Sequence, residues 1–242
     1  SEGEDDGDDD VFRPRVTLVT DLRCEIPEEE GEGHAYNIEK RHIRETVDLA
    51  DAFVFVWGDG KYGKLGHQSL DTLHVPYVVS ALQRISIRMC ALGKQHTLFL
   101  STDGYVLAAG SSAYGQLGNG DDTEVRTTPV LVQSISGIKA IAAGHYHSMA
   151  LTEMGKVYTW GSGSWGKLGT GSDANYKVPR LVASLQSMLV DSITCGAHHC
   201  ACLTASGDVW SWGKGLRGQL GHNSCKEEYS PRLMAMLRKK GA

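Results

Sequence analysis

The amino-acid sequence predicts an all-β protein, a β-propeller made of four-stranded antiparallel blades. Three observations support this fold class. A unit of 51 or 52 residues repeats along the chain, its segments are short and rich in β-branched or aromatic residues, and glycine contributes 29 of the 242 residues, mostly at expected turns. Repeats of this length are typical of radial stacking, because stacking covers the faces and edges that a lone sheet exposes. A linear β-solenoid is the alternative.

The N-terminal region, residues 1–33, is expected to be an acidic arm that is mostly disordered. It holds 13 acidic and 3 basic residues, a net charge of −10, whereas residues 34–242 hold 16 acidic and 21 basic residues, a net charge of +5. Seven acidic residues among the first ten repel one another and offer nothing to a core. The simplest interpretation is a solvated tail, and the alternative is a segment that attracts and binds a basic partner.

Between the arm and the repeats, residues 34–53 predict a connector. A short helix from Asn37 to about Leu49 is one interpretation, since Asn is a favoured N-cap and apolar residues recur there at three- and four-residue spacing. Within the arm, Val16–Val19 has the composition of a strand instead. Residues 11–51 are therefore expected either to supply an atypical strand or two, or to connect to something outside the propeller.

The repeats begin at Val54, each with an aromatic-Gly step followed by Gly-x-Leu-Gly. Three full copies and a partial fourth are visible, and each copy is expected to form one antiparallel blade. A proline follows each step and an apolar strand ending in glycine comes next. The copies are residues 54–105, 106–156, 157–208 and 209–242.

Each copy also carries fixed stations that are interpreted as structural. Glycine is expected at tight turns, and the tryptophans are expected to be buried between blades, with Ala109 in their place in the second copy. A histidine recurs at one strand start, and since a catalytic residue acts only once, this histidine is expected to make a hydrogen bond repeated in every blade. The structural positions are Trp57, Gly58, Gly66, Gly93, His96, Gly110, Gly118, Gly144, His147, Trp160, Gly161, Gly169, Gly196, His199, Trp212, Gly213 and Gly221.

These stations resemble the regulator-of-chromosome-condensation repeat family, whose repeat reads roughly Gly-x-x-His-Ser/Thr, then Asp-Gly-x-Val-Tyr-x-Trp-Gly, then Tyr-Gly-Gln-Leu-Gly. The likeness covers about Val54 to Met236 and recurs at several independent stations. The resemblance implies a seven-bladed propeller, of which this chain would hold roughly half. The missing blades would then come from a longer polypeptide, a second chain or a larger assembly.

The resemblance allows several functions, because one fold serves many roles. The main hypothesis is a non-catalytic protein-protein interaction module, part of a larger protein or assembly, in the cytoplasm or nucleus. One alternative is the substrate-recruiting propeller of a HECT-type ubiquitin ligase. Another is a guanine-nucleotide exchange factor for a small GTPase with chromatin association, which would call for an inserted wedge and a basic tail. The repeats of 51 or 52 residues leave no room for a wedge, and the arm is acidic.

A further branch of the family senses ultraviolet light and places tryptophan directly after the strand-ending glycine. This chain has Lys94, His145 and Ala197 at those positions, so the photoreceptor interpretation is excluded. Nucleic acid is not an expected partner, since the acidic arm disfavours phosphate. No apolar run has the length of a membrane span, and no membrane insertion is expected.

No cofactor or metal is expected. The Gly-x-Gly-x-x-Gly string at Gly58 recurs with the repeat and no helix follows it, so it is not a dinucleotide motif. Leu168 stands where a phosphate loop needs a hydroxyl. The densest set of metal-ligand residues falls on ordinary strand positions of the repeat, and it comprises Cys195, His198, His199, Cys200 and Cys202.

Partner contacts are predicted on the loops after the aromatic-Gly steps. These loops vary between copies while the glycines and spacings do not, and variable loops on a rigid frame suit recognition. Packing of the loops against the frame is the alternative interpretation. Trp165 and Arg217 are the strongest candidates, since such side chains are frequent interface hot spots. The full set is Lys61, Tyr62, Tyr114, Trp165, Leu216 and Arg217.

Overall fold

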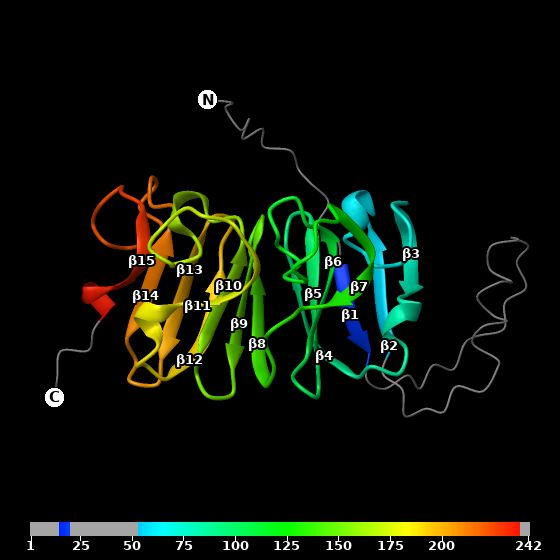
Figure 1. The fold of residues 1–242 in the computed structure, drawn as a ribbon, viewed down its shortest axis with the longest axis horizontal. Coiled ribbons are helices and arrows are strands. Elements are labelled where there is room, and N and C mark those ends of the chain that lie inside the picture. Colours follow the sequence, from blue (N-terminus) through cyan, green and yellow to red (C-terminus); the bar gives the residue numbers. More distant parts are fainter. Residues whose placement is uncertain (1–14, 20–52, 238–242) are drawn as a thin grey trace, which may run out of the picture.

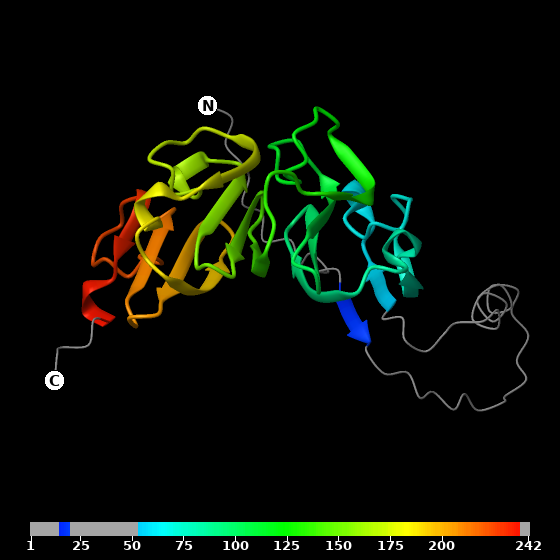
Figure 2. The ribbon, with the colours of Figure 1, turned by 60° about the horizontal axis from the view of Figure 1, so that its bottom comes forward.

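The computed structural model describes residues 15–19 and 53–237. Their strands form four antiparallel sheets, placed side by side in an arc (Figures 1 and 2). The all-β propeller predicted from the repeats is therefore confirmed. The helix expected near Asn37 lies outside the described residues. Among the described residues, every helix is a single 3-10 turn of three residues, and none is long and apolar enough to cross a bilayer.

The first sheet has three strands, in the order β1-β2-β3. Its first strand lies at Arg15–Val19, where the sequence allowed a strand, and it pairs with β2 from Arg15 opposite Trp57 to Val19 opposite Phe53. In the other sheets the second strand pairs with the third in this way, so β1 takes the place of a second strand. The strands are β1 (Arg15–Val19), β2 (Phe53–Gly58) and β3 (Leu73–Val78).

The other three sheets are four-stranded meanders in which neighbours in sequence are neighbours in space. First strands of successive sheets contact each other, which places them on the same side of the arc. The strands are β4 (Ile87–Leu92), β5 (His96–Ser101), β6 (Val106–Ser111), β7 (Val125–Leu131), β8 (Ile138–Ala143), β9 (His147–Thr152), β10 (Val157–Gly161), β11 (Tyr176–Leu181), β12 (Val190–Cys195), β13 (His199–Thr204), β14 (Val209–Gly213) and β15 (Glu228–Leu233).

The blades do not coincide with the sequence copies, so the prediction of one blade per copy is wrong. The copy 54–105 gives β2 and β3 to the first sheet but β4 and β5 to the second. The physical reason is that each copy ends with two paired strands, and the second of them, such as β5, pairs with the first strand of the next copy, such as β6. Single 3-10 turns join some of the elements: η1 (Lys61–Gly63), η2 (Ser80–Leu82), η3 (Ser164–Gly166), η4 (Ala183–Leu185) and η5 (Ala235–Leu237).

The repeated residues have clear structural causes. The third strand of every sheet shifts register against the fourth at the aromatic position, and the glycine after it has a positive φ, as at Gly110, where φ is 120°. A Cβ at Gly110 would lie 2.3 Å from the carbonyl oxygen of Gln95. A Cβ at Gly93 would lie 2.4 Å from the His96 ring, so that glycine lets the imidazole lie against the backbone. Fourth strands carry the prolines, as sheet edges tolerate them.

Two of the three repeat tryptophans are buried as predicted. Trp160 and Trp212 are 0% exposed, and their indole N–H groups donate to the carbonyl oxygens of Gln116 and Lys167, in the loops of the preceding blades, at 2.9 and 3.1 Å. Trp57 is only half-buried, so its predicted burial is wrong. The described chain has no sheet before β1-β2-β3 to cover it.

Candidate functional site

One end of the arc gathers all the loops that follow third strands. Antiparallel pairing places the end of a third strand beside the start of a second strand, as Gly110 pairs with His96. The turns between first and second strands therefore lie at the same end (Figure 1, upper edge). We call this end the loop face. It consists of residues 59–72, 93–95, 112–124, 144–146, 162–175, 196–198 and 214–227.

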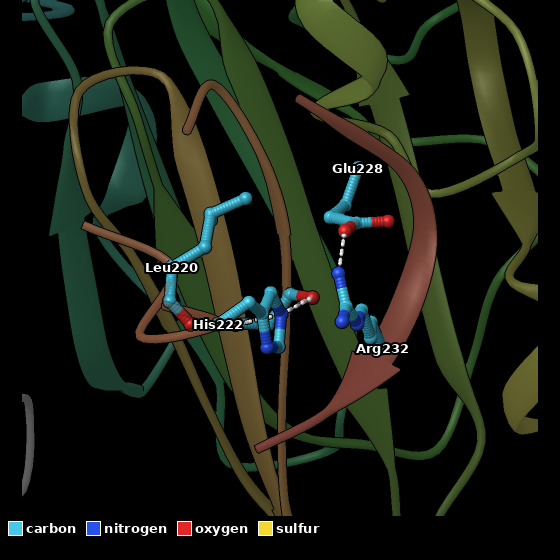
Figure 3. Close-up of polar contacts among 5 residues, drawn as sticks. Leu220, His222, Glu228 and Arg232 are labelled. Atoms are coloured by element: carbon cyan, nitrogen blue, oxygen red, sulfur yellow. Dashed lines mark hydrogen bonds and ion pairs between the residues drawn. The ribbon is translucent and has the colours of Figure 1, made fainter. Parts of the chain in front are cut away.

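Side-chain hydrogen bonds anchor two of the long loops to the strands that precede them. In the last blade the Ser211 hydroxyl donates to the carbonyl oxygen of Leu220 at 2.7 Å and lies 3.0 Å from His222 Nε2, and Arg232 pairs with Glu228 within β15 (Figure 3). Thr159 makes the same bond to the Leu168 carbonyl in the preceding blade. Repeated anchoring of this kind fixes where the loop side chains point.

The predicted partner-binding residues all lie on the loop face. Lys61 and Arg217 are exposed, and Leu216 is 50% exposed. Tyr62 and Trp165 are half-buried and have positive φ values of 65° and 60°, which are unusual for bulky residues. Backbone strain of this kind often accompanies functional positions.

The structure brings two of the six predicted residues, Tyr114 and Trp165, into one group and leaves the other four outside it. Lys61 and Tyr62 lie in the first loop, where the ammonium group of Lys61 sits 5.2 Å from the Tyr62 ring centroid. We call the central group the aromatic–lysine cluster. It consists of Lys94, Tyr114, His145, Tyr146, Trp165, Lys167, His198 and Lys214.

On the side of the second blade, Tyr146 is the centre of the cluster. Its ring meets that of Tyr114 edge-on at 5.3 Å between centroids and lies 6.0 Å from the ring of its neighbour His145. The Lys94 ammonium lies 5.8 Å from the Tyr146 ring centroid. Cation–π contacts at such exposed sites each contribute about 0.5–1 kcal/mol.

Toward the last blade, Trp165 is the second centre. The His198 ring lies 4.9 Å from both the Trp165 ring and the His145 ring, and so links the two halves. The Lys214 ammonium is 4.3 Å and the Lys167 ammonium 5.2 Å from the Trp165 ring centroid. Lys167 is 1% exposed, so the rings surround a buried cation. The cluster thus crosses three blades.

Six residues of the cluster were not predicted as contact candidates: Lys94, His145, Tyr146, Lys167, His198 and Lys214. Four of them lie in turns between first and second strands, and only strand pairing brings these turns beside the loops. The available signal was variation after the strand-ending glycines, where the copies read Lys-Gln, His-Tyr and Ala-His.

Two of the repeated histidines, His96 and His147, connect neighbouring blades. The sequence predicted a hydrogen bond in every blade but did not indicate that its partner lies in the next one. His96 Nε2 lies 2.9 Å from the Ser148 hydroxyl of the next blade, which itself donates to the Gln116 carbonyl at 2.8 Å. Because that hydroxyl proton is used, His96 Nε2 must donate. Burial lowers the pKa of His96 to about 3, so the ring is neutral at pH 7.

His147 faces a thiol where His96 faces a hydroxyl. Its Nε2 lies 3.1 Å from Cys200 Sγ, which is 3.7 Å from Cys195 Sγ. These three ligand atoms are within 4.8 Å of one another, a different set from the one the sequence suggested, because His198 instead joins the aromatic–lysine cluster. Burial raises the pKa of Cys200 well above its usual range, and the thiol donates to the Lys167 carbonyl at 3.3 Å. The arrangement matches the repeated hydrogen bond, and a metal-free site stays a prediction.

The sequence matches known proteins over most of its length. A family profile described as an RCC1-like domain matches residues 46–241. Human HERC2, an E3 ubiquitin-protein ligase, is 38% identical over 191 residues, which is 77% of this chain but 4% of that protein. Mouse HERC4, a probable E3 ubiquitin-protein ligase, is 41% identical over 171 residues, 70% of this chain and 16% of that protein. The chain spans only a small part of these two relatives.

Solved structures agree with the fold. The crystal structure of human WBSCR16 superposes with a TM-score of 0.68 at 26% identity, covering 77% of this chain and 48% of that chain. Yeast Prp20p superposes with a TM-score of 0.64 at 23% identity, covering 76% and 46%. The ultraviolet-B receptor UVR8 of Arabidopsis thaliana is 36% identical over 186 residues, 76% of this chain and 42% of that protein. With a matching profile, repeated stations and propeller blades in agreement, the chain belongs to the RCC1-like domain family.

Proposed function

We propose that the chain is a non-catalytic protein-binding module whose partner is recognised by the loop face. The observation that carries the proposal is the aromatic–lysine cluster. It presents partly exposed rings and cations from three blades on loops that are pinned to the strands. Such a surface resembles an interface hot spot, where large rigid side chains give contact area at low entropic cost.

The cluster also gives the proposed surface its chemistry. The Lys94 and Lys214 ammonium groups lie over rings, so a partner that brings carboxylates meets fixed positive charge, while Tyr114 and Trp165 offer apolar area. Arg217 and Leu216 extend the same face in the last blade. This chemistry favours a protein partner with acidic and apolar side chains.

A second candidate function is substrate recruitment for a ubiquitin ligase. It is favoured by the identity of 38% with human HERC2 and of 41% with mouse HERC4, of which this chain matches only a part. Ligase chemistry would then belong to other parts of a larger protein. The same loop face serves either role, since recruiting a substrate is also protein binding.

Guanine-nucleotide exchange remains the alternative to be tested. The solved structure of yeast Prp20p is described with its binding properties to Gsp1p and histones, but the likeness at 23% identity bears on the fold alone. The loops between third and fourth strands have similar lengths, so no blade carries an inserted wedge among the described residues. The UVR8 likeness does not extend to photoreception, because Lys94, His145 and Ala197 replace the tryptophans.

The test is affinity capture with quantitative mass spectrometry, using the 242-residue chain as bait. The Trp165→Gly and Lys214→Gln double variant removes the centre of the cluster, and Trp165→Gly also relieves the positive φ, so the fold should hold. The matched control is Tyr105→Ala with Lys156→Gln, at turns on the opposite end.

We expect proteins captured by the parent and by the control variant to be reduced at least tenfold with the cluster variant. Arg217→Ala tests whether the surface extends outward. Equal retention by the cluster variant would contradict the site. Accelerated nucleotide release from a panel of GTPases carrying fluorescent nucleotide would instead support the exchange-factor role.

A further inference from the structure

We propose that the acidic segment at residues 1–10 binds the aromatic–lysine cluster of its own chain and competes with the partner for that surface. The inference deepens the proposed function and rests on it in using the same surface. Three observations carry it: where β1 begins, which cations lack a carboxylate partner, and how long the intervening chain is.

The direction of β1 places the segment at the loop face. Arg15 pairs with Trp57 and Val19 with Phe53, so the N-terminal end of β1 lies where β2 enters its loop. Because β1 occupies a second-strand position, the chain just before Arg15 enters the blade where the other blades have their turns. That position is in the row that holds Lys94–Gln95, His145–Tyr146 and Ala197–His198. The N-terminal end of β1 therefore lies at the face that carries the cluster.

Among the described residues, the cluster brings two cations without a carboxylate partner, from two blades, around one set of rings. Other described cations likewise form no ion pair with a carboxylate: Lys61, Arg84, Lys156, Arg180, Arg217 and Lys226. Within the described residues, Lys94 and Lys214 lie over aromatic rings and make no ion pair with a carboxylate. Six other described lysines and arginines do have such pairs: Lys64, Arg88, Arg126, Lys139, Lys177 and Arg232. The seven acids of the segment match this uncovered charge: Glu2, Glu4, Asp5, Asp6, Asp8, Asp9 and Asp10.

Chain length allows the contact. Only residues 11–14 lie between the segment and β1. Fully extended, four residues span about 13–14 Å, so the tether that connects the segment to the blade is short. Strand β1 also contacts β4, which leads into the turn that carries Lys94. A tether this short gives an effective concentration on the order of millimolar. Even if the cluster binds the free decapeptide only weakly, the tethered segment should therefore occupy the cluster for a substantial fraction of the time.

The consequence is competition inside the molecule. A partner that binds the cluster must displace the segment, so its apparent affinity falls by the factor by which the segment occupies the surface. Since the attraction is between exposed charges, salt weakens it. The competition should therefore be strongest at low salt and should fall as the salt concentration rises, by the same factor for every partner that needs this surface.

The test uses a fluorescein-labelled decapeptide with the sequence of residues 1–10 and four full-length chains. These are the parent, a chain whose seven arm acids are changed to the corresponding amides, that neutral-arm chain with Lys94→Gln and Lys214→Gln, and the neutral-arm chain with Arg84→Gln and Lys156→Gln. The last pair removes two charges at the opposite end. Fluorescence anisotropy at about 50 and 500 mM salt measures peptide binding.

We expect the neutral-arm chain to bind the peptide at least tenfold more tightly than the parent at low salt, because its own arm no longer competes. The Lys94/Lys214 variant should lose at least fivefold, the Arg84/Lys156 variant should bind as its neutral-arm parent does, and the differences should shrink at high salt. Circular dichroism melting checks that each variant is folded.

Equal peptide binding by the parent and the neutral-arm chain would overturn the proposal, as would equal loss in the Lys94/Lys214 and Arg84/Lys156 variants. Its failure is distinguishable from failure of the proposed function. If partner capture depends on the cluster while the peptide does not bind, only the intramolecular contact is wrong. If the peptide binds while partner capture ignores the cluster, the proposed partner surface is wrong.

Discussion

Phe99 and Ala109 exchange sizes with their counterparts in the other blades. Trp160 and Trp212 stand at the position of Ala109, while Ala150 and Cys202 stand at the position of Phe99. Ala109 and Phe99 are both 0% exposed and belong to one core cluster. In each of the last three blades, one large and one small side chain lie in the same core cluster, so the missing tryptophan of the second copy is compensated rather than lost.

This compensation predicts strong coupling between the two positions. Phe99→Ala should cost about 3–5 kcal/mol of unfolding free energy by leaving a cavity, and Ala109→Trp alone should overpack the layer and cost about 1–3 kcal/mol. The double variant should be more stable than the sum of these costs implies, by at least about 1 kcal/mol. Chemical denaturation of all four chains measures this, and simple additivity would refute the exchange.

The buried histidines predict a dependence of stability on acidity. Burial lowers the pKa of His96 to about 3, and burial followed by the charge of Lys167 lowers that of His147. An unfolded histidine has a pKa near 6.5, so below that pH the unfolded chain binds more protons than the folded one. The contribution is fully present above pH 6.5 and is lost as the pH falls toward 3.

We expect unfolding free energy to fall between pH 6 and pH 5, with each of these histidines contributing up to about 1.4 kcal/mol per pH unit. His96→Gln should reduce that slope by roughly one histidine's share, whatever it does to stability at pH 7. Urea denaturation at several pH values gives the slope. An unchanged slope in the variant would show that His96 is not the titrating group.

Cys200 offers a test of the metal-free prediction. Ser148 is its counterpart, and both side chains donate to a carbonyl of the preceding blade. We therefore expect Cys200→Ser to change unfolding free energy by less than about 1.5 kcal/mol and chelator-washed protein to hold no stoichiometric metal. Elemental analysis decides the second point. One equivalent of zinc, lost in Cys200→Ser, would show a metal centre at His147, Cys195 and Cys200.

At the scale of elements, the repeated tryptophans differ by what lies beside their blade. Trp160 packs against the preceding sheet and bonds to its Gln116 carbonyl, whereas Trp57 is half-buried. Trp160→Ala should cost about 3–5 kcal/mol, and Trp57→Ala should cost less than half as much. Denaturant titration compares the two. Equal costs would mean that Trp57 has a covering neighbour in solution.

The strands and turns were predictable because their signals are local. A glycine with positive φ, such as Gly110, or a proline at a sheet edge, such as Pro129, determines the chain path within a few residues. The blade boundaries could not be predicted in this way. The sequence marks where a copy repeats, but it does not indicate whether β4 pairs with the strand before it or with the strand after it. The candidate loops were found by comparing copies, whereas Tyr146 and His198 join them only through strand pairing.

At the scale of the whole molecule, both ends of the arc expose layers that are buried elsewhere. Leu100 and Leu151 are 0% exposed, but Leu203, at the same position in the last sheet, is 37% exposed. His199 is also half-buried where His96 and His147 are fully buried. At the other end of the arc, Trp57 is half-buried where Trp160 and Trp212 are fully buried. The described blades thus present two uncovered faces of the kind that favour association.

We expect the 242-residue chain to self-associate through these faces. Sedimentation velocity should show a weight-average mass that rises with concentration, and Leu203→Lys should shift the distribution toward monomer by placing a charge on the exposed layer. Leu216→Lys, at an exposed loop position, is the control. A compact monomer at every concentration would contradict the open arc and would require that other residues of the chain cover its ends.

The half-copy offset between sequence copies and blades has a mechanical consequence. A stretch such as residues 54–105 holds the outer strands of one sheet and the inner strands of the next. Unfolding one copy therefore breaks hydrogen bonds in two neighbouring sheets at once. Under tension, the rupture of one blade should weaken the next, so that the described blades fail in rapid succession.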